Sequence, residues 1–592
     1  MAQTTVSFND VAPANAHPHT GSAINTPHTS QFSLLQTPRF SVILIALVLI
    51  VAVRIVSGSK SKKLPPGVKP LPRLPGLPWA GRFWDVPGPG VEAALHFGAL
   101  HKKYGPIYEW QVMGVTHVWI ETDKVARDLF VLRQKNYCDR NVLPGNLGIK
   151  EDCEILPLSG YSDDFKRHKN FIHSIMRHSH PKQFYGWPVI ENKRTLRRLL
   201  ESPDRWSEHM LVHCARTIAS IAWGDAEHGK KLLTIVPELL KAVSPEGPII
   251  NKLTFLQNLP YAISPFKKAE AIRKQTMTDA FYEALDDVKA KVAQGNAPNC
   301  WSTLWLENEK GVQASKLDYH EAAYAIGSSS FVAIATIGGP LHSFFLAMCT
   351  YPEWMPKMQE EIDRVCGDRI PAVEDMPQLP RLRATVKELL RWRQSTPLGV
   401  PHEALEDDVY EGHLIQKGSM CHANHYLISR EADKYPKGDQ FIPERWLDPS
   451  YPSYKEPLTE FPNLSGDRAF GYGSRACPGI DLTQMELTTL FGALAWAFDI
   501  KSKEGAGPLP WYEVNPYVIT MTLPFPLEIK ARTEQKRQWI MDEVKDPGYW
   551  LTTERKSKWD IVHDTEKSAW TWDGLACPYE QPKVPKVYPA GH

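Results

Sequence analysis

The chain has 592 residues, and 43% of them are apolar, which is enough for a large hydrophobic core and too many for a disordered chain. Its 68 lysines and arginines nearly balance 67 aspartates and glutamates, so the formal charge of +1 does not indicate nucleic acid as a partner. The nine cysteines are scattered without a CxxC pair, which favours a reducing compartment over a disulfide framework.

The N-terminal part predicts a membrane anchor. Residues 1–39 are polar and rich in Thr, Ser, Pro and His, and we expect a disordered tail there. Residues 40–58 follow; as a helix, their apolar part Phe40–Val56 would span roughly 25 Å, close to the ~27 Å core of the endoplasmic reticulum bilayer. This segment is apolar on every face, unlike an amphipathic core helix, and it lacks the charged start and small-residue end of a signal peptide. We therefore predict a transmembrane helix.

The residues around the predicted anchor indicate its orientation. Arg39 is the only Lys or Arg before it, whereas five basic residues follow it: Lys60, Lys62, Lys63, Lys69 and Arg73. The positive-inside rule places the tail in the lumen and the body of the chain in the cytosol. Residues 59–78 are too proline-rich for a helix or central strand and are predicted to form a stiff hinge. We expect a single-pass protein of the endoplasmic reticulum membrane, in contact with membrane lipid.

The body of the chain begins with a strand-rich region and continues with helices. The stretches GPIYEWQV (105–112) and THVWIE (116–121) predict two paired strands around a Met-Gly turn. Asp318 and Glu321 have the spacing of a capping box, and the helix that they start is expected to run to about Met348. Residues 79–535 contain no second linker and are predicted to form one large, mainly helical domain.

Residues 536–592 form a C-terminal extension that matches no catalytic pattern. It contains five tryptophans among many charged residues. We predict that it packs on the body of the chain, and a surface for a partner protein is the alternative.

The stretch FGYGSRACPG, residues 470–479, places one cysteine in a glycine-rich loop. The glycines permit positive φ angles and a close approach of the backbone to something flat and bulky. The next segment, IDLTQMELTTLFGALAWAF, has the apolar pattern of a buried helix, so Cys477 precedes a helix N-terminus that stabilises a thiolate. Arg475 supplies a planar fork suited to a carboxylate. This combination suits axial ligation of haem iron, and an ordinary buried cysteine is the alternative.

The whole loop resembles the F-x-x-G-x-R-x-C-x-G signature of the cytochrome P-450 family at every fixed position: Phe470, Gly473, Arg475, Cys477 and Gly479. An anchor followed by a proline-rich hinge is similar to the microsomal, membrane-anchored type, and the chain resembles fungal members of secondary metabolism. The resemblance covers roughly residues 64–535. It implies the cytochrome P-450 fold, mainly α with a small β-rich region, and haem b with Cys477 as the axial ligand of the iron.

Further motifs of the family follow the expected order along the chain. Glu388 and Arg391 in KELLRW match the helical E-x-x-R, which alone would be an ordinary i,i+3 ion pair. Arg445 in FIPERW matches the arginine that completes a Glu-Arg-Arg cluster in the family. The resemblance implies a structural role for these three residues.

Other matches concern the haem propionates. His402, at the end of STPLGVPH, resembles the basic residue that meets a propionate in the family. Where the family commonly has W-R-x-x-R, this chain has Phe165, Lys166 and Lys169. Lysine keeps the charge but loses the bidentate fork, so we expect Lys169 to contact a propionate as a point charge.

The resemblance implies a haem-thiolate monooxygenase that inserts one atom of O2 into a small apolar organic substrate. A thiolate ligand favours cleavage of the O–O bond. Electrons are expected from NADPH through a separate NADPH-cytochrome P-450 reductase, because the chain has no glycine-rich dinucleotide fingerprint in a βαβ setting. The expected role is the biosynthesis of a secondary metabolite.

The predicted long helix departs from the family on its oxygen side. At the A/G-G-x-D/E-T position the chain has VAIAT, residues 332–336, so Thr336 is kept as the expected catalytic residue and Ala335 replaces the acid. Pro340 has no N–H and leaves the carbonyl of Thr336 without its helical donor, which predicts a kink there. We expect this carbonyl to order a water that partly replaces the missing acid.

Several reactions remain compatible with this departure. Hydroxylation with another proton source is one. Oxidative coupling, ring formation or rearrangement on the same haem is another, and so is a redox-neutral isomerase or dehydratase. A haem-binding scaffold without catalysis is the non-enzymatic alternative. The sequence predicts an apolar pocket around residues 142–158 and 520–523 without specifying the substrate.

Overall fold

The computed structural model describes residues 64–87, 91–140, 154–244, 248–251, 253–307, 316–511, 513–515 and 517–544. All of them belong to one unit of the chain, Ser61–His592. The predicted tail and transmembrane helix, and residues 545–592 of the predicted extension, lie outside the described residues.

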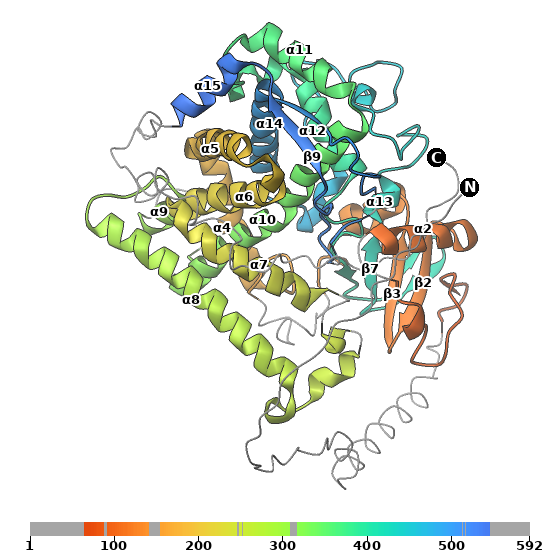
Figure 1. The fold of residues 1–592 in the computed structure, drawn as a ribbon. Helices are drawn as coiled ribbons and strands as arrows, with labels where there is room; N and C mark the ends of the chain where they lie inside the picture. Colours follow the sequence, from red (N-terminus) through yellow and green to blue (C-terminus); the bar gives the residue numbers. More distant parts are fainter. Residues whose placement is uncertain are drawn as a thin grey trace, which may run out of the picture. The chain divides into compact units, whose positions relative to one another are not determined.

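Helices form most of this region (Figure 1). The longer ones are α2 (Val91–Tyr104), α4 (Asp163–Ser179), α5 (Trp187–Glu201), α6 (Trp206–Trp223), α7 (Gly229–Val243), α8 (Pro265–Ala293), α10 (Tyr319–Thr350), α11 (Trp354–Cys366), α12 (Pro380–Trp392) and α14 (Ile480–Ala497). The shorter ones are α3 (Asp123–Arg127), α9 (Trp301–Leu306), α13 (His425–Ile428) and α15 (Glu534–Glu543).

Helix α10 begins at the predicted capping box. The Asp318 carboxylate accepts the N–H of Glu321 at 2.8 Å, and the Glu321 carboxylate accepts the N–H of Asp318 at 3.0 Å. The helix continues through Pro340 to Thr350, two residues beyond the predicted end. Among the described helices it alone is long and apolar enough to cross a membrane, but 83% of its most apolar stretch is buried inside the fold. α10 is therefore the central core helix.

The strands form three small sheets. One has the order β2 (Ile107–Val112), β3 (Val115–Ile120), β7 (Met420–Ala423) and β4 (His402–Glu403). Another has the order β1 (Lys69–Pro70), β6 (His413–Ile415) and β5 (Asp408–Tyr410), and the third pairs β8 (Phe498–Ser502) with β9 (Leu527–Ala531). The predicted hairpin is confirmed: β2 and β3 are antiparallel around Met113 and Gly114, whose φ angles are +47° and +84°.

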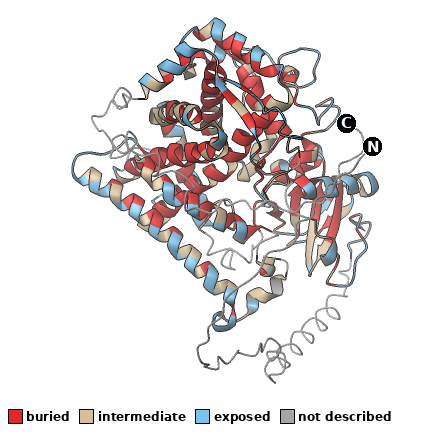
Figure 2. Ribbon diagram, viewed as in Figure 1, coloured by how far each residue is buried: buried red, intermediate tan, exposed pale blue. Residues whose placement is uncertain are grey.

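Two helices that carry predicted site residues are joined in the core. Figure 2 shows buried residues concentrated along α6, α10 and α14. Phe344 of α10 stacks on Phe491 of α14 with ring centroids 4.2 Å apart, and neither side chain is exposed. Full burial of such a side chain contributes roughly 1.5–3 kcal/mol. This packing fixes the helix of Thr336 against the helix that follows the cysteine loop.

Both ends of the described region pack on the body. In the predicted hinge, β1 pairs in parallel with β6 at a sheet edge, where proline is tolerated, and Leu71 and Leu74 are buried. At the other end, Ile540 of α15 is fully buried, and Trp539 meets the edge of Trp496 at 5.2 Å. The first turns of the predicted extension are thus part of the folded body.

Candidate functional site

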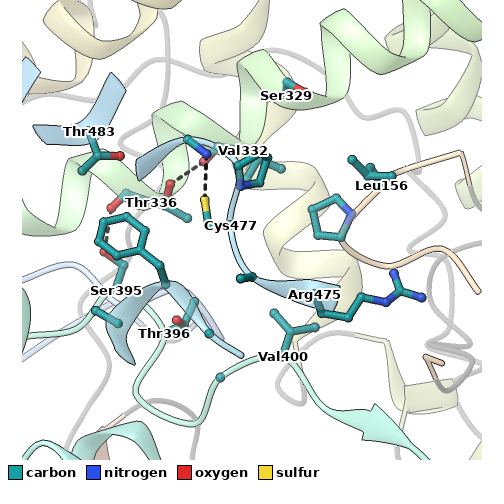
Figure 3. A pocket seen from close by; sticks show the side chains of 18 of the residues that line it. Leu156, Ser329, Val332, Thr336, Ser395, Thr396, Val400, Arg475, Cys477 and Thr483 are labelled. Carbon is teal, nitrogen blue, oxygen red and sulfur yellow. Dashed lines mark hydrogen bonds between the residues drawn. The ribbon is translucent and has the colours of Figure 1, made fainter. Parts of the chain in front are cut away.

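A cavity of about 260 Å³ lies where α4, α10, the segment after α12 and the cysteine loop converge (Figure 3). The site residues predicted from the sequence come from segments far apart in the chain, and the fold brings most of them to the wall of this cavity. The predicted residues that line it are Lys169, Thr336, His402, Phe470, Arg475, Cys477 and Gly479.

The cysteine loop has the backbone geometry that its glycines permit. Gly471 and Gly473 have φ angles of +81° and +55°. A Cβ on Gly473 would lie 2.0 Å from the carbonyl oxygen of Phe130, so only glycine fits against that backbone. The N–H of Cys477 donates to the carbonyl of Phe470 at 2.8 Å, which closes the loop. Gly473 therefore does not line the cavity; it lets the loop pack against the backbone of Phe130 behind the wall.

The sulfur of Cys477 is directed to the cavity just before α14. Gly479 precedes the first residue of α14, and its N–H donates to the Sγ of Cys477 at 3.3 Å. The exposed surface of Cys477 faces the cavity that it lines, and this cavity lies inside the fold. Burial raises the pKa of its thiol above the ordinary value, while the N–H of Gly479 acts in the opposite direction. A cationic metal at the sulfur would favour the thiolate.

Two of the predicted basic residues, Arg475 and Lys169, join the loop to other segments of the chain. The guanidinium of Arg475 stacks 3.8 Å from the centre of the Phe165 ring, and its Nε donates to the carbonyl of Cys138 at 2.7 Å. The ammonium of Lys169 donates to the carbonyl of Ser474. Burial and the neighbouring Arg475 lower the pKa of Lys169. Phe165 thus contributes a stacking surface at the position where the family commonly has tryptophan.

His402 is held as a neutral ring. Its Nδ1 lies 2.6 Å from the carbonyl of Tyr137, so Nδ1 carries the hydrogen, because a carbonyl only accepts. The ring stacks on Phe130 at 4.0 Å. Burial, with Arg140 and Arg475 nearby, lowers the pKa of His402 well below its ordinary value. The cavity is therefore cationic through its arginines and Lys169 rather than through His402.

Arg140 is a basic residue of this cavity that sequence reasoning missed. It is buried, its Nε donates to the carbonyl of Pro157 at 3.0 Å, and its Nη1 donates to the carbonyls of Val400 and Pro401 at 2.9 and 2.6 Å. A lone arginine in YCDRN matches no motif. Its place follows from the bridge between Asp139 and the β4 residue Glu403, which sets it beside the end of the strand.

These residues fit a haem group. The cavity combines one thiol with the cationic side chains of Arg140, Lys169 and Arg475, in walls that are otherwise largely apolar. A flat, apolar molecule with carboxylates and a metal needs that donor set. The glycines of the loop allow the close approach that a flat ring requires.

On α10 the structure corrects one expectation. The carbonyl of Thr336 accepts a hydrogen bond from the Oγ of Ser395 at 2.6 Å, so a side chain of the protein occupies the place expected for an ordered water. The hydroxyl of Thr336 donates to the carbonyl of Val332 at 3.0 Å. Ala335, at the position of the family's acid, is buried and is not part of the cavity wall. The sequence showed the freed carbonyl but not its donor, which lies 59 residues away.

The Glu-Arg-Arg residues meet in the interior, away from the cavity. The carboxylate of Glu388 accepts from Arg391 at 2.8 and 2.9 Å and from the Nε of Arg445 at 3.0 Å. It also accepts from the indole N–H of Trp446 at 3.0 Å, a partner that the sequence did not indicate. Glu388 and Arg445 are completely buried. This cluster fixes the end of α12, which leads into the segment that lines the cavity.

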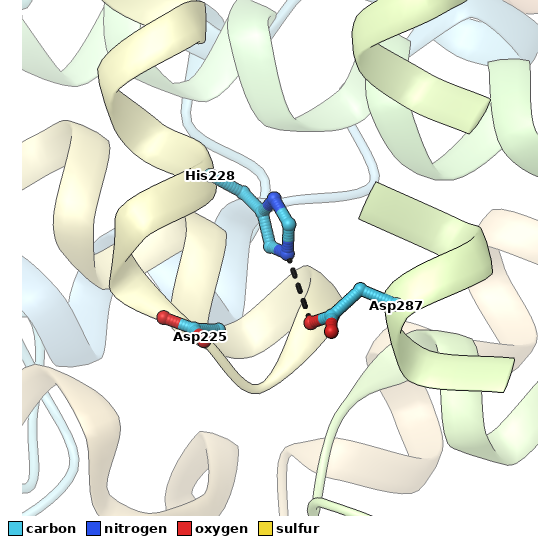
Figure 4. A group of neighbouring side chains, drawn as sticks. All are labelled: Asp225, His228 and Asp287. Atoms are coloured by element: carbon cyan, nitrogen blue, oxygen red, sulfur yellow. Dashed lines mark hydrogen bonds and ion pairs between the residues drawn. The ribbon is translucent and has the colours of Figure 1, made fainter. Parts of the chain in front are cut away.

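A second group of side chains has metal-ligand spacing among the described residues: Asp225, His228 and Asp287 (Figure 4). The ammonium of Lys291 lies 2.6 Å from Asp287 and 3.2 Å from Asp225. A cation of the protein itself therefore satisfies both carboxylates. We interpret the group as an ion-pair network between α8 and the turn after α6.

Comparison with known proteins agrees with the fold and the cavity. The model of the cytochrome P-450 family matches residues 65–529. The cytochrome P-450 monooxygenase psoD of Aspergillus fumigatus is 30% identical over 468 residues, which cover 76% of this chain and 88% of psoD. The monooxygenase claR of Ampulloclitocybe clavipes is 29% identical over 497 residues, which cover 81% of this chain and 89% of claR.

A solved structure shows the same fold. A zebra fish cytochrome P-450 with progesterone superposes with a TM-score of 0.60 over 74% of this chain and 99% of that chain, at 18% identity. The family match spans most of the chain and contains every residue of the cavity described above. The chain therefore belongs to the cytochrome P-450 family of monooxygenases.

Proposed function

We propose that this chain is a membrane-anchored haem-thiolate enzyme that oxidises a small apolar organic molecule in fungal secondary metabolism. One observation supports this most strongly: Cys477 and Thr336 line the same cavity, and its wall is mostly apolar. The fungal monooxygenases to which the chain is similar support the biological setting.

The proposed cofactor is haem b, which the family implies. Cys477 would bind the iron, and Arg140, Lys169 and Arg475 would hold the carboxylates, with the ring against Phe470. His402, neutral and with its hydrogen on Nδ1, would offer Nε2 as an acceptor there rather than add charge. When bound, a haem with a thiolate ligand supplies the activation of O2.

The remaining wall residues bind the substrate and exclude water. Leu156, Val332 and Val400 form apolar surface around the cavity (Figure 3). Ala333 also lines it. Thr336 is the proposed catalytic residue, because its hydroxyl lies at the cavity wall, where its hydrogen is bonded to the carbonyl of Val332 and its oxygen can accept a hydrogen bond. Burial of an apolar substrate against this surface contributes roughly 25 cal/mol per Å².

A second candidate function is oxidative coupling, ring formation or rearrangement on the same haem. The described residues that line the cavity include no Asp or Glu, so the wall itself offers no carboxylic acid as a proton donor. General acid catalysis contributes typically ~10²–10⁴-fold, which makes a reaction with little need of proton delivery the natural alternative. A redox-neutral isomerase or dehydratase and a non-catalytic haem-binding scaffold are further alternatives, because neither needs a carboxylic acid in the cavity wall.

The proposed partners are O2 and NADPH-cytochrome P-450 reductase. Residues 40–58 are proposed to anchor the protein in the endoplasmic reticulum membrane, with the tail 1–39 in the lumen and residues 59–78 leading to the cytosolic domain. An alkaline carbonate wash of microsomes tests the anchor: the full chain should stay in the membrane pellet, and a chain that is released would exclude a spanning helix.

The function is tested with the full chain and its reductase. The metabolite that accumulates when the gene is deleted is isolated and supplied with NADPH and O2. A product that contains one atom of labelled O2 supports monooxygenation, and NADPH-dependent product without the label supports coupling or ring formation. Product formed without NADPH indicates an isomerase or dehydratase, and no product at all indicates a scaffold.

A further inference from the structure

A side chain from outside α10 compensates for the proline within it. Pro340 has no N–H, so the carbonyl of Thr336, four residues earlier, lacks its i→i+4 donor. Ser395, which lies shortly after the end of α12, donates its hydroxyl to that carbonyl at 2.6 Å. Both Thr336 and Ser395 line the cavity, so the contact belongs to its wall (Figure 3).

The packing around this contact leaves little freedom. A Cβ on Gly339 would lie 2.8 Å from the Oγ of Ser395 and 2.8 Å from the carbonyl oxygen of Thr520, so the glycine makes room for both segments. The N–H of Thr520 donates to the carbonyl of Ser395 at 2.7 Å, and its hydroxyl donates to the carbonyl of Gln394 at 3.0 Å. Three separate segments of the chain thus meet at the turn of α10 that carries Thr336.

We propose that Ser395 is a positioning residue: its hydroxyl closes the gap that Pro340 leaves in α10, keeps water off the carbonyl of Thr336, and so fixes the hydroxyl of Thr336 at the cavity wall.

The reasoning rests on what each hydroxyl does with its single hydrogen. Ser395 gives its hydrogen to Thr336, and Thr336 gives its own to Val332. Neither hydroxyl therefore offers a free O–H while these bonds persist. A water at the carbonyl of Thr336 would bring protons to this side of the cavity without control by the protein. Reduction of O2 by two electrons from NADPH, with two protons, would then release hydrogen peroxide instead of serving the substrate.

The test uses the full chain with bound haem, its reductase and NADPH, without added substrate. The measured quantities are hydrogen peroxide released per NADPH oxidised and the Soret spectrum of the resting ferric enzyme, which reports water near the iron. The variants are Ser395→Ala, Pro340→Ala and the two together. Ser330→Ala is the matched control, because it removes from α10 a buried hydroxyl that donates to the carbonyl of Ile326 at 2.9 Å and does not line the cavity.

Ser395→Ala should raise the peroxide fraction by up to about tenfold, the factor that one hydrogen bond is worth, and should alter the resting spectrum. Ser330→Ala should change neither. Pro340→Ala gives position 340 a main-chain N–H that the carbonyl of Thr336 can accept, so the serine becomes dispensable. In that background Ser395→Ala should have no further effect.

Two results would overturn the proposal. One is an unchanged peroxide fraction and spectrum in Ser395→Ala. The other is an equal effect of Ser395→Ala with and without Pro340→Ala, which would mean that the serine acts by another route. If Ser395→Ala alone fails to bind haem, the double variant decides: it regains haem if the serine serves the carbonyl of Thr336, and failure to regain it contradicts the proposal.

Discussion

Glu486 is a buried acid whose ionisation should contribute to the pH dependence of stability. It lies on α14 with 1% of its surface exposed, and its Oε1 is 3.6 Å from the Nε2 of His213 on α6, too long for a hydrogen bond. His213 in turn meets Thr195 of α5 through Nδ1 at 3.0 Å. Burial raises the pKa of Glu486 to about 8 and lowers the pKa of His213 to about 4. Both groups are therefore neutral between these values, despite their ion-pair geometry.

The sign of the effect follows from the direction of the shift. In the unfolded chain the carboxyl has its ordinary pKa of 4.5, so above that value the unfolded chain loses a proton that the folded protein keeps. The contribution of Glu486 to stability is thus lost progressively as the pH rises from about 4.5 to about 8. The difference between the unfolded and folded pKa values of Glu486, at ~1.4 kcal/mol per pKa unit, corresponds to roughly 5 kcal/mol in the free energy of unfolding.

Glu486→Gln keeps the shape of the side chain and removes its titration. We expect the thermal unfolding midpoint of Glu486→Gln, measured relative to that of the native protein, to rise from pH 5 to pH 8, so that the variant is the more stable protein at pH 8. Buried histidines such as His213 titrate in both proteins and cancel in this difference. Midpoints are compared at one scan rate, because large proteins unfold irreversibly. Asp433→Asn, at an exposed position, is the control. The same pH slope in Glu486→Gln as in the native protein would refute the reasoning.

Three further predictions concern packing and charge elsewhere. Gly473→Ala should abolish haem loading, because its Cβ would lie 2.0 Å from a carbonyl oxygen. Gly505→Ala, which has φ +75° but open space around it, should load haem normally. The haem absorbance per protein measures loading in both variants. Arg445→Ala should destabilise the protein by about 3–5 kcal/mol in a denaturant titration, since it leaves Glu388 buried with less compensation, and a loss below about 1 kcal/mol would contradict a supporting role. A hydrogen bond from the neighbouring histidine, with one from a lysine, lowers the pKa of Asp287 to about 2. The contribution of Asp287 to the free energy of unfolding is therefore present above about pH 4 and is lost as the pH falls toward 2. Asp287→Asn should flatten this loss of stability in acid, and an unchanged loss would argue against the interpretation.

The sequence predicted those parts of the site that local patterns determine. The geometry of the cysteine loop depends on glycines and a helix start that lie within ten residues of each other, and the start of α10 depends on a capping box three residues wide. Such features follow from backbone freedom and capping alone. The resemblance to the cytochrome P-450 family, rather than these local patterns, placed Cys477 and Thr336 in one site before any coordinates.

The parts that the sequence could not show depend on contacts between distant segments. Arg140 lines the cavity because its neighbour Asp139 bridges to Glu403, some 260 residues later, and no spacing rule indicates such a contact. Pro340 revealed a carbonyl without a helical donor, which led to the expectation of a water. Its donor, Ser395, comes from another segment, and tertiary packing alone brings the two together.

The most direct test of the account is the carbon monoxide difference spectrum of the reduced full-length protein. Thiolate ligation of haem by Cys477 predicts the red-shifted Soret band in the native protein and in Cys349→Ser, a change at the end of α10, away from the cavity wall. Cys477→Ser should lose the band. A native protein that binds haem without the red-shifted band, or a Cys477→Ser variant that keeps it, would contradict the central claim that Cys477 is the iron ligand.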